Sequence, residues 1–302
     1  MQFSPEWMDI ACIKGTWDVI ISEDADHELE GILVYHMRKY KGFTLILMPP
    51  QTFYNGIYLN YKDKPKTHSK ISFENNVVNK LLAQLPSHDL YYQQYAPQIT
   101  NNMPQIWAGY NTSTRYTYLI DIQNKSEEEL WSQLKTKTRN KIRKAINLTK
   151  IISIDFNTFW AHCEKAFAIK GKAVPFNKTI LSKAYDTLNK KGTCEIRASV
   201  DVESNKILAA TLMTKDTYST YYVAGYYLSE KKDSGALSYL LWDSIKNCNT
   251  PIFDFEGSMI KSVEYFFRAF GGQLTPHYKV WKINSPLLKF ITKFKKLPFL
   301  DW

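Results

Sequence analysis

Apolar and polar residues alternate with a period of two in the segments that we expect to form strands. These are 17–21, 31–36, 43–48, 90–95, 115–121, 194–201, 206–214, 218–227, 251–255 and 277–283. Other segments repeat apolar residues every three or four positions, which is typical of helices: 77–85, 126–148, 158–169, 178–190, 235–246 and 260–270. Because expected strands and expected helices follow each other along the chain, the pattern predicts an α/β fold with mixed sheets. Both halves carry a run of consecutive strands, which is compatible with a duplicated fold.

Segment 251–283 is the most informative part of the chain. It predicts a strand, a polar Glu-Gly-Ser turn, a helix and a second strand, and glycines 271 and 272 end the helix. Asp254 and Glu256 stand where the strand meets the turn. That is the strand end at which open α/β sheets bind ligands, so these carboxylates are candidate functional groups.

Segment 126–148 predicts one long helix. Ser126 can cap it, and three glutamates fill its first turn, where the helix dipole favours anions. Its second half is basic, with Lys135, Arg139 and Arg143 spaced four apart. Such a stripe can bind phosphate, although the alternative for a single charged helix is a solvated face.

Composition and charge narrow the class of protein. The chain has 302 residues and a net charge of +10, which suggests two domains and an anionic partner such as a nucleic acid, a phosphorylated small molecule or a membrane surface. An ordinary basic enzyme is the alternative. The four cysteines form no CxxC pair and the histidines no HExxH motif, so we expect neither a disulfide scaffold nor a metal site. Without a signal peptide or a membrane-spanning run, a cytoplasmic protein is expected.

Four motifs together resemble the FemAB-like branch of the GNAT (N-acetyltransferase-like) superfamily. They are RYTY at 115–118, TRNKIRKA at 138–145, FDFEGS at 253–258 and FRAFGG at 267–272. The resemblance implies two tandem GNAT-like domains, which we place at 1–149 and 150–285, followed by a tail at 286–302. It also implies transfer of an acetyl or aminoacyl group from acyl-CoA or aminoacyl-tRNA to an amine, such as one on a peptidoglycan precursor. No tightly bound cofactor and no metal are implied.

The resemblance assigns donor binding to the loop that precedes helix 235–246. Backbone N–H groups there hold the pyrophosphate of CoA in GNAT domains, and Lys232, Gly235 and Ala236 occupy that place in this chain. Leu237 stands where a small residue is usual, so the motif is degenerate. No long basic arm of the kind that some cross-bridge enzymes insert is present, which weakens the tRNA alternative. A GNAT-fold binding protein that has lost its donor is therefore the alternative function.

Acyl transfer needs an acceptor for the amine proton and donors to the carbonyl oxygen. Asp254 or Glu256 is the candidate base. Tyr222 and Tyr226 lie on the strand that lines the donor cleft in this superfamily, and strict alternation would place both on one face. Gly225 would let a ligand approach the backbone. Each has a structural alternative: an ion pair for Asp254, helix capping by Glu256 with Ser258, and packing for the tyrosines.

Three further candidates lie outside this segment. Tyr54, in a turn with Asn55 and Gly56, is similar to an aromatic segment near the substrate groove of the family, although a turn that needs Asn55 and Gly56 is the favoured alternative. Lys279 and Lys282 lie on the final strand, where related proteins have a lysine that stabilises charge in the transfer step. Edge-strand lysines that only aid solubility are the alternative.

The tail is basic and amphipathic. Apolar residues fall on one side and lysines on the other: Leu287, Phe290, Ile291 and Phe294 against Lys289, Lys293 and Lys296. Such a helix can lie on an anionic membrane, which would bring a monomeric protein to the inner face of the membrane. The alternative is that the apolar side packs on the second domain.

Overall fold

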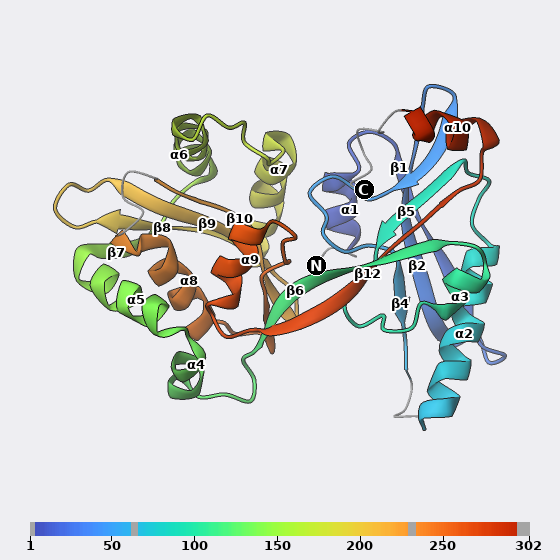
Figure 1. Ribbon diagram of the computed structural model, residues 1–302, viewed down its shortest axis with the longest axis horizontal. Coiled ribbons are helices and arrows are strands. Elements are labelled where there is room, and N and C mark those ends of the chain that lie inside the picture. The colour runs from blue at the N-terminus through green and yellow to red at the C-terminus, as the bar shows by residue number, and fades with distance from the viewer. Residues whose placement is uncertain (1–3, 62–65, 229–233, 295–302) are drawn as a thin grey trace. The chain divides into compact units, whose positions relative to one another are not determined.

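The chain forms two compact units. In the computed structural model, which describes residues 4–61, 66–228 and 234–294, one unit runs up to Arg115 and resumes at Pro276, and the other spans Tyr116–Thr275. We call them the split unit and the inserted unit. The chain passes into the inserted unit within β6 (Asn111–Asp121) and returns within β12 (Gln273–Ile283) (Figure 1).

The split unit is built on a mixed sheet in the order β1-β2-β3-β5-β12. Neighbours are antiparallel except β3 and β5, which are parallel, and β4 pairs with β2. Its other elements are α1 (Pro5–Ala11), β1 (Thr16–Glu23), β2 (Leu29–Tyr40), β3 (Phe43–Leu47), β4 (Ile57–Leu59), α2 (Thr67–Ala83), β5 (Leu90–Gln94), α3 (Met103–Trp107) and α10 (Pro286–Phe294).

Alternation along the strands gives the split unit a core on each face of its sheet. On one face Ile46 and Tyr91 pack with Val77 and Leu81 of α2. On the other face Leu45, Leu47, Leu90 and Tyr92 form a cluster with Leu288 of α10. Both faces of β5 are therefore covered.

The inserted unit has the sheet order β6-β11-β10-β9-β8-β7. β7 to β10 form an antiparallel meander, β11 is parallel to β10, and β6 is antiparallel to β11. Its elements are α4 (Glu127–Gln133), α5 (Thr136–Leu148), β7 (Thr149–Ser153), α6 (Phe156–Ile169), α7 (Lys178–Leu188), a 3-10 turn (Asn189–Lys191), β8 (Cys194–Asp201), β9 (Ile207–Lys215), β10 (Ser219–Tyr227), α8 (Ala236–Lys246), β11 (Ile252–Asp254) and α9 (Lys261–Arg268).

The two units repeat one plan. Each has an antiparallel meander, a crossover that includes a helix (α2 or α8), a parallel strand (β5 or β11) and an antiparallel strand beside it. In the split unit this antiparallel strand is β12, which follows the other strands of the unit in the sequence. In the inserted unit it is β6, which precedes them. The mixed α/β fold expected from the sequence is confirmed, and the repeated plan agrees with a duplicated fold.

The bounds of the compact units differ from the expected boundary after residue 149. Segment 126–148 lies in the inserted unit with residues 150–275. This segment belongs to the inserted unit because its apolar residues Leu130, Leu134 and Ile142 pack in the core of that unit, against Leu241 of α8 and Phe270.

Segment 126–148 is also two helices, α4 and α5, where the pattern predicted one. Leu134 leaves the helix with φ −61° and ψ 138°, and the N–H of Lys135 donates to the carbonyl of Ala269 at 3.0 Å. The break lets Leu134 remain in the core while α5 takes a new direction. The predicted cap is confirmed: the Ser126 hydroxyl accepts from the N–H of Glu129, whose carboxylate accepts from the N–H of Ser126.

Candidate functional site

Two neighbouring parallel strands of the inserted unit pair briefly and then part. β10 and β11 are in register over Ser219–Tyr221 and Ile252–Asp254. Beyond that point the N–H of Phe255 donates to the carbonyl of Tyr118 on β6, whereas β10 continues to Tyr227. The described β10–β11 ladder therefore ends at Tyr221 and Asp254.

A bulge in β10 lies at the same point. Tyr222 is opposite Met213 of β9, but Ala224 is opposite Leu212, so Val223 is the extra residue. Met213 and Leu212 point to opposite faces, and so do Tyr222 and Ala224. The prediction that Tyr222, Ala224 and Tyr226 share a face is wrong, because it assumed unbroken alternation.

Tyr222 lies on the sheet face that α8 covers. Its ring packs edge-to-face on Phe267 at 5.7 Å between centroids, and its hydroxyl occupies the space where a Cβ of Gly225 would lie. Gly225 therefore makes room for the Tyr222 side chain, and close approach of a ligand to its backbone remains a prediction. Burial raises the pKa of Tyr222 further above its ordinary value near 10, at which a phenol is already neutral at pH 7 and can donate a hydrogen bond.

Tyr226 faces the opposite side of the sheet. Its ring is 5.5 Å from that of Phe159 on α6, and burial raises its pKa. The buried hydroxyl has no hydrogen-bond partner among the described residues. Tyr226 therefore has the surroundings of a core residue, and it does not lie beside Tyr222.

Asp254 organises the turn at the end of β11. One of its carboxylate oxygens accepts from the hydroxyl of Thr117 at 2.6 Å and from the N–H of Glu256 at 2.7 Å. The side chain is buried. These bonds join the end of β11 to β6, so Asp254 holds the turn in place.

Glu256 has an unusual conformation for a buried acid. Its side chain is 7% exposed and its φ is +54°, in the left-handed region that costs a non-glycine residue about 1–2 kcal/mol. Gly257 follows with φ +66°, and a Cβ there would meet the carbonyl of Tyr116. Such strain is typical of functional sites. In the alternative, Glu256 and Ser258 cap the next helix; α9 begins after Ile260 without a side-chain cap, and the Ser258 hydroxyl accepts from the N–H of Ile260 itself at 3.1 Å.

The predicted donor loop is described only in part. Lys232 lies outside the described residues. Gly235 precedes α8 with φ +77°, and a Cβ there would collide with the carbonyl of Lys141 on α5. Ala236 is buried, and its N–H donates to the Ser234 hydroxyl at 3.2 Å. Close packing of α5 therefore accounts for the glycine, and its role in donor binding remains a prediction.

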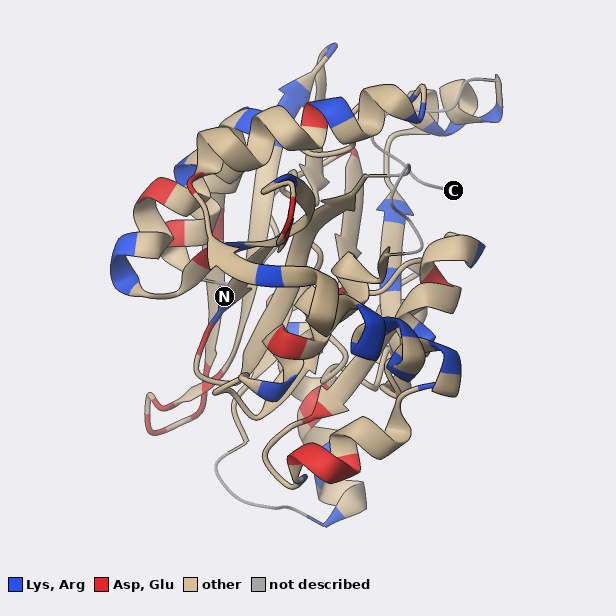
Figure 2. Ribbon diagram, turned by 90° about the vertical axis from the view of Figure 1, so that its left-hand side faces the viewer, with Lys and Arg blue, Asp and Glu red and all other residues tan. Residues whose placement is uncertain are grey.

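The three basic residues of the predicted stripe all make contacts within the unit. Lys135 donates to the Tyr265 hydroxyl at 2.6 Å, Arg139 donates to the carbonyl of Ser132 at 2.8 Å, and Arg143 lies over the Trp131 ring. Arg139 thus caps the C-terminus of α4. A second basic group on α5 consists of Lys137, Lys141 and Lys144, so the helix presents cations without any acidic residue (Figure 2).

The remaining candidates belong to the split unit. Tyr54 is buried, with its ring edge-on to His277, so it is a core residue although the sequence suggested a loop tip. Lys279 is also buried, 5.2 Å from the Trp281 ring. Lys282 donates to the carbonyl of Ala108 at 2.8 Å. In the inserted unit, Asp254 and Glu256 lie together where β11 ends in a turn, and Asp254 shares a sheet face with Tyr221, its partner in the register, whereas Tyr222 lies on the opposite face.

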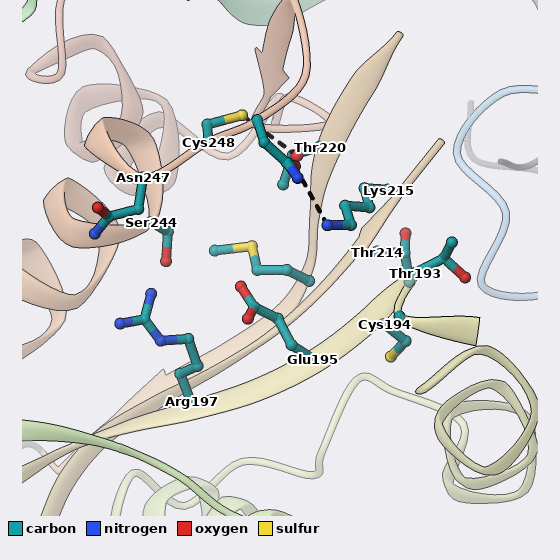
Figure 3. A pocket seen from close by; sticks show the side chains of 13 residues that line it. Thr193, Cys194, Glu195, Arg197, Thr214, Lys215, Thr220, Ser244, Asn247 and Cys248 are labelled. Carbon is teal, nitrogen blue, oxygen red and sulfur yellow. Dashed lines mark hydrogen bonds between the residues drawn. The ribbon is translucent and has the colours of Figure 1, made fainter. Parts of the chain in front are cut away.

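A pocket of about 160 Å³ in the inserted unit was not predicted. It lies between β8, β9 and the C-terminal half of α8, and Figure 3 shows its polar lining, including Glu195, Arg197, Lys215, Ser244 and Cys248. Arg197 pairs with Asp243, and the Lys215 ammonium donates to Asn249 at 3.2 Å. Met213 is opposite both Glu195 and Tyr222, so the pocket and Tyr222 share a sheet face. These residues come from separate elements, and nothing in their spacing signals a site.

A buried polar group in the split unit was also missed. It consists of Asn55, Gln93, Gln105 and His277, which are fully buried, and neither side-chain polar atom of Asn55 or Gln93 has a hydrogen-bond partner among the described residues. Buried amides are usually paired, so this region is a candidate for internal water. The alternating YYQQY segment was the available signal, because it places Gln93 on the face of Tyr91 and Tyr95.

The described residues contain neither a metal-binding cluster nor a helix that could span a membrane. No group of three or more His, Cys, Asp or Glu side chains in residues 4–61, 66–228 and 234–294 is arranged to hold a metal ion. Over the same residues, no helix is both long and apolar enough for a bilayer crossing.

Comparison with known proteins gives a clear result for the fold. No protein-family model and no curated protein sequence matches the chain. Among solved structures, FemX is similar with a TM-score of 0.71 and 13% identity, over 95% of this chain and 93% of that one. The C-terminal domain of a candidate lysylphosphatidylglycerol synthetase from Agrobacterium fabrum is similar with a TM-score of 0.56 and 8% identity, over 95% and 89%. A conserved protein of unknown function from Bacteroides thetaiotaomicron has a TM-score of 0.54 and 10% identity, over 92% and 88%. At these identities the likeness establishes the fold, and the predicted tandem GNAT-like fold is confirmed.

Proposed function

We propose that the chain is a GNAT-type acyltransferase that moves an acyl or aminoacyl group to an amine. The observation that carries the proposal is the point where β10 and β11 part. There β10 has a bulge at Val223 next to Tyr222, and the strained, buried Glu256 follows the end of the neighbouring strand β11. The likeness of the fold to FemX supports the same reaction class by analogy.

The proposed chemistry assigns one task to each group. Glu256 takes the proton that the attacking amine loses, directly or through a water molecule. Backbone N–H groups at the Val223 bulge stabilise the carbonyl oxygen as it becomes anionic. The Tyr222 hydroxyl, which is neutral at pH 7, donates a hydrogen bond to that oxygen or to the leaving group. Asp254 positions Glu256 through the bond to its N–H.

The donor is proposed from the positive charge of α5. Acyl-CoA and aminoacyl-tRNA both carry phosphates, and the cations of α5 that we assign to them are Lys137, Lys141 and Lys144. The acceptor that we propose is the amine of a small molecule or of a cell-wall precursor. A binding protein without catalysis is the second candidate, because packing of α5 alone explains Gly235.

Replacing Glu256 tests the proposed function. The substitutions Glu256→Gln and Tyr222→Phe would be compared with Tyr218→Phe, since Tyr218 is highly exposed. Thiol release from a panel of acyl-CoAs and transfer from charged tRNA would be measured with peptidoglycan precursors and free amines. We expect Glu256→Gln to lower turnover by about 10²–10⁴-fold, as loss of a general base does. Tyr222→Phe should also lower turnover, whereas Tyr218→Phe should not.

Two outcomes would contradict the proposal. Unchanged turnover in Glu256→Gln would remove this carboxylate from the mechanism. Saturable binding of a donor without any turnover, in a wild-type protein that unfolds cooperatively, would favour the binding protein over the enzyme.

A further inference from the structure

Helix α10 turns much of its apolar side outward. Leu288 is 2% exposed and packs in the cluster of Leu45, Leu47 and Tyr92. In contrast, Leu287 and Phe290 are 60% exposed and Phe294 is 77% exposed. Leu288 is therefore the fully buried residue of α10, and a stripe of a leucine and two phenylalanines lies on its surface. We call these three residues the apolar stripe.

The stripe is held in a defined place on the split unit. The hydroxyl of Ser285 accepts from the N–H of Leu288 at 3.3 Å and caps the helix. Just before it, Asn284 donates its backbone N–H to the carbonyl of Asp89 at 2.8 Å and its side-chain amide to that of His88 at 3.1 Å. These bonds join α10 to the segment that enters β5. The exposure of the stripe is thus a property of an anchored helix.

The rings of the stripe lie against each other while they remain exposed. The centroids of Phe290 and Phe294 are 5.1 Å apart. Two large rings at adjacent turns, next to Leu287, form one contiguous apolar surface. Exposed apolar groups gathered in this way mark interaction surfaces more often than single exposed residues do.

Cations flank the stripe. Lys289 and Lys293 are exposed and one turn apart, and Pro286–Phe294 contains no acidic residue. Aromatic and aliphatic residues on one side with lysines beside them are the pattern of helices that lie in the plane of a membrane interface. The protein as a whole carries a net charge of +10, which favours an anionic surface.

We propose that α10 docks the protein on an anionic lipid bilayer, with Leu287, Phe290 and Phe294 inserted among the acyl chains near the headgroups and Lys289 and Lys293 on the anionic headgroups. The charge pattern favours this occupant over a second copy of the same basic chain, because two such lysine-flanked helices repel each other. This surface is independent of the proposed transfer reaction, whose residues lie in the inserted unit.

Another exposed apolar helix provides the matched comparison. Met103, Ile106 and Trp107 of α3 are exposed, and Trp107 is 65% exposed. α3 carries no lysine or arginine. An apolar stripe without flanking cations should contribute little to selective binding of anionic lipid.

Co-sedimentation of the full-length protein with vesicles tests the docking surface. The vesicles are phosphatidylcholine alone or phosphatidylcholine with phosphatidylglycerol as the minor component. We expect binding only to the anionic vesicles, weakened by added salt. The double change Phe290→Ser and Phe294→Ser should weaken it by tenfold or more, and Lys289→Gln with Lys293→Gln by about 25-fold, roughly fivefold for each lysine.

Two controls separate this surface from general charge and hydrophobicity. Trp107→Ser should leave binding unchanged, and so should Lys172→Gln with Lys190→Gln, two exposed lysines of the inserted unit. Equal binding by wild type and the α10 variants would overturn the proposal. So would a wild-type dimer in size-exclusion chromatography with light scattering that the Phe290→Ser, Phe294→Ser change dissociates, because the stripe would then cover a second copy.

Discussion

His277 is a fully buried imidazole beside aromatic rings of the split unit. Burial in the first place, and the charge of Arg115, lower its pKa from 6.5 to about 4. The unfolded chain therefore binds a proton between pH 6.5 and 4 that the folded chain does not. This difference leaves the free energy of unfolding unchanged above pH 6.5. As the pH falls from 6.5 toward 4, protonation of the unfolded chain lowers the free energy of unfolding by about 3 kcal/mol at most.

This pH dependence can be measured by urea unfolding of wild type and His277→Gln. The free energy of unfolding of the wild type should fall more steeply than that of the variant between pH 6.5 and 4. Because His36 and His88 also have lowered pKa values, the difference between the two proteins is the relevant quantity. Parallel curves would show that His277 is solvated or paired in the folded protein.

Tyr226 provides a prediction of opposite sign from that usual for a core substitution. Its buried hydroxyl has no hydrogen-bond partner among the described residues. Removing the hydroxyl therefore removes a desolvation cost that no hydrogen bond offsets in the folded protein. Tyr226→Phe should unfold at the same or a higher urea concentration, with turnover unchanged. A clear loss of stability would mean that the hydroxyl has a partner, such as an internal water, and a loss of activity would return Tyr226 to the site.

At the level of residues, the sequence identified the chemical groups better than their conformations. The placement of Asp254 and Glu256 after a strand could be predicted from alternation and the turn. The left-handed φ of Glu256 could not, because nothing local distinguishes a glutamate that is held in strain by its surroundings. The Val223 bulge was equally hidden, and it alone separated Tyr222 from Tyr226.

At the level of elements, α5 and α8 are joined by a contact that only glycine permits. Gly235 has φ +77°, and its Cβ position is taken by the Lys141 carbonyl. We expect Gly235→Ala to lower the free energy of unfolding by about 2–4 kcal/mol, from backbone strain plus the collision. Gly171 has φ +62° with nothing near its Cβ position, so Gly171→Ala should cost only about 1 kcal/mol.

Urea unfolding of both glycine variants measures this difference. Equal effects would mean that α5 moves freely away from α8. The same pair of helices shows where patterns fail: the apolar period continues through Leu134, so one helix was expected, and only the core position of Leu134 and the bond from Lys135 to Ala269 reveal the break.

At the level of the molecule, the inserted unit is one continuous stretch of chain, whereas the split unit is made of two stretches that the inserted unit separates. Residues 116–275 contain every strand of the inserted unit's sheet, including the Leu119–Asp121 part of β6 that pairs with β11. Residues up to 115 lack β12, which pairs with β5 over Lys279–Ile283. We expect a 116–275 fragment to unfold cooperatively, whereas a 1–115 fragment should not fold.

Circular dichroism during urea unfolding of the two fragments measures this. A 1–115 fragment with a cooperative transition would contradict the expectation, because β5 would then be stable without its neighbour. The duplicated plan could be suspected from two strand meanders in the sequence. The pairing of β12 with β5 in the split unit could not be predicted, because nothing in the sequence of segment 277–283 indicates which strand it pairs with.

The placement of β12 also sets an order during synthesis. The inserted unit is complete when Thr275 has been made, since all its strands precede that residue. The sheet of the split unit must wait for residues 279–283, so one edge of β5 is unpaired throughout the translation of the inserted unit. The sheet of the split unit is thus completed only by residues that follow the whole inserted unit in the sequence.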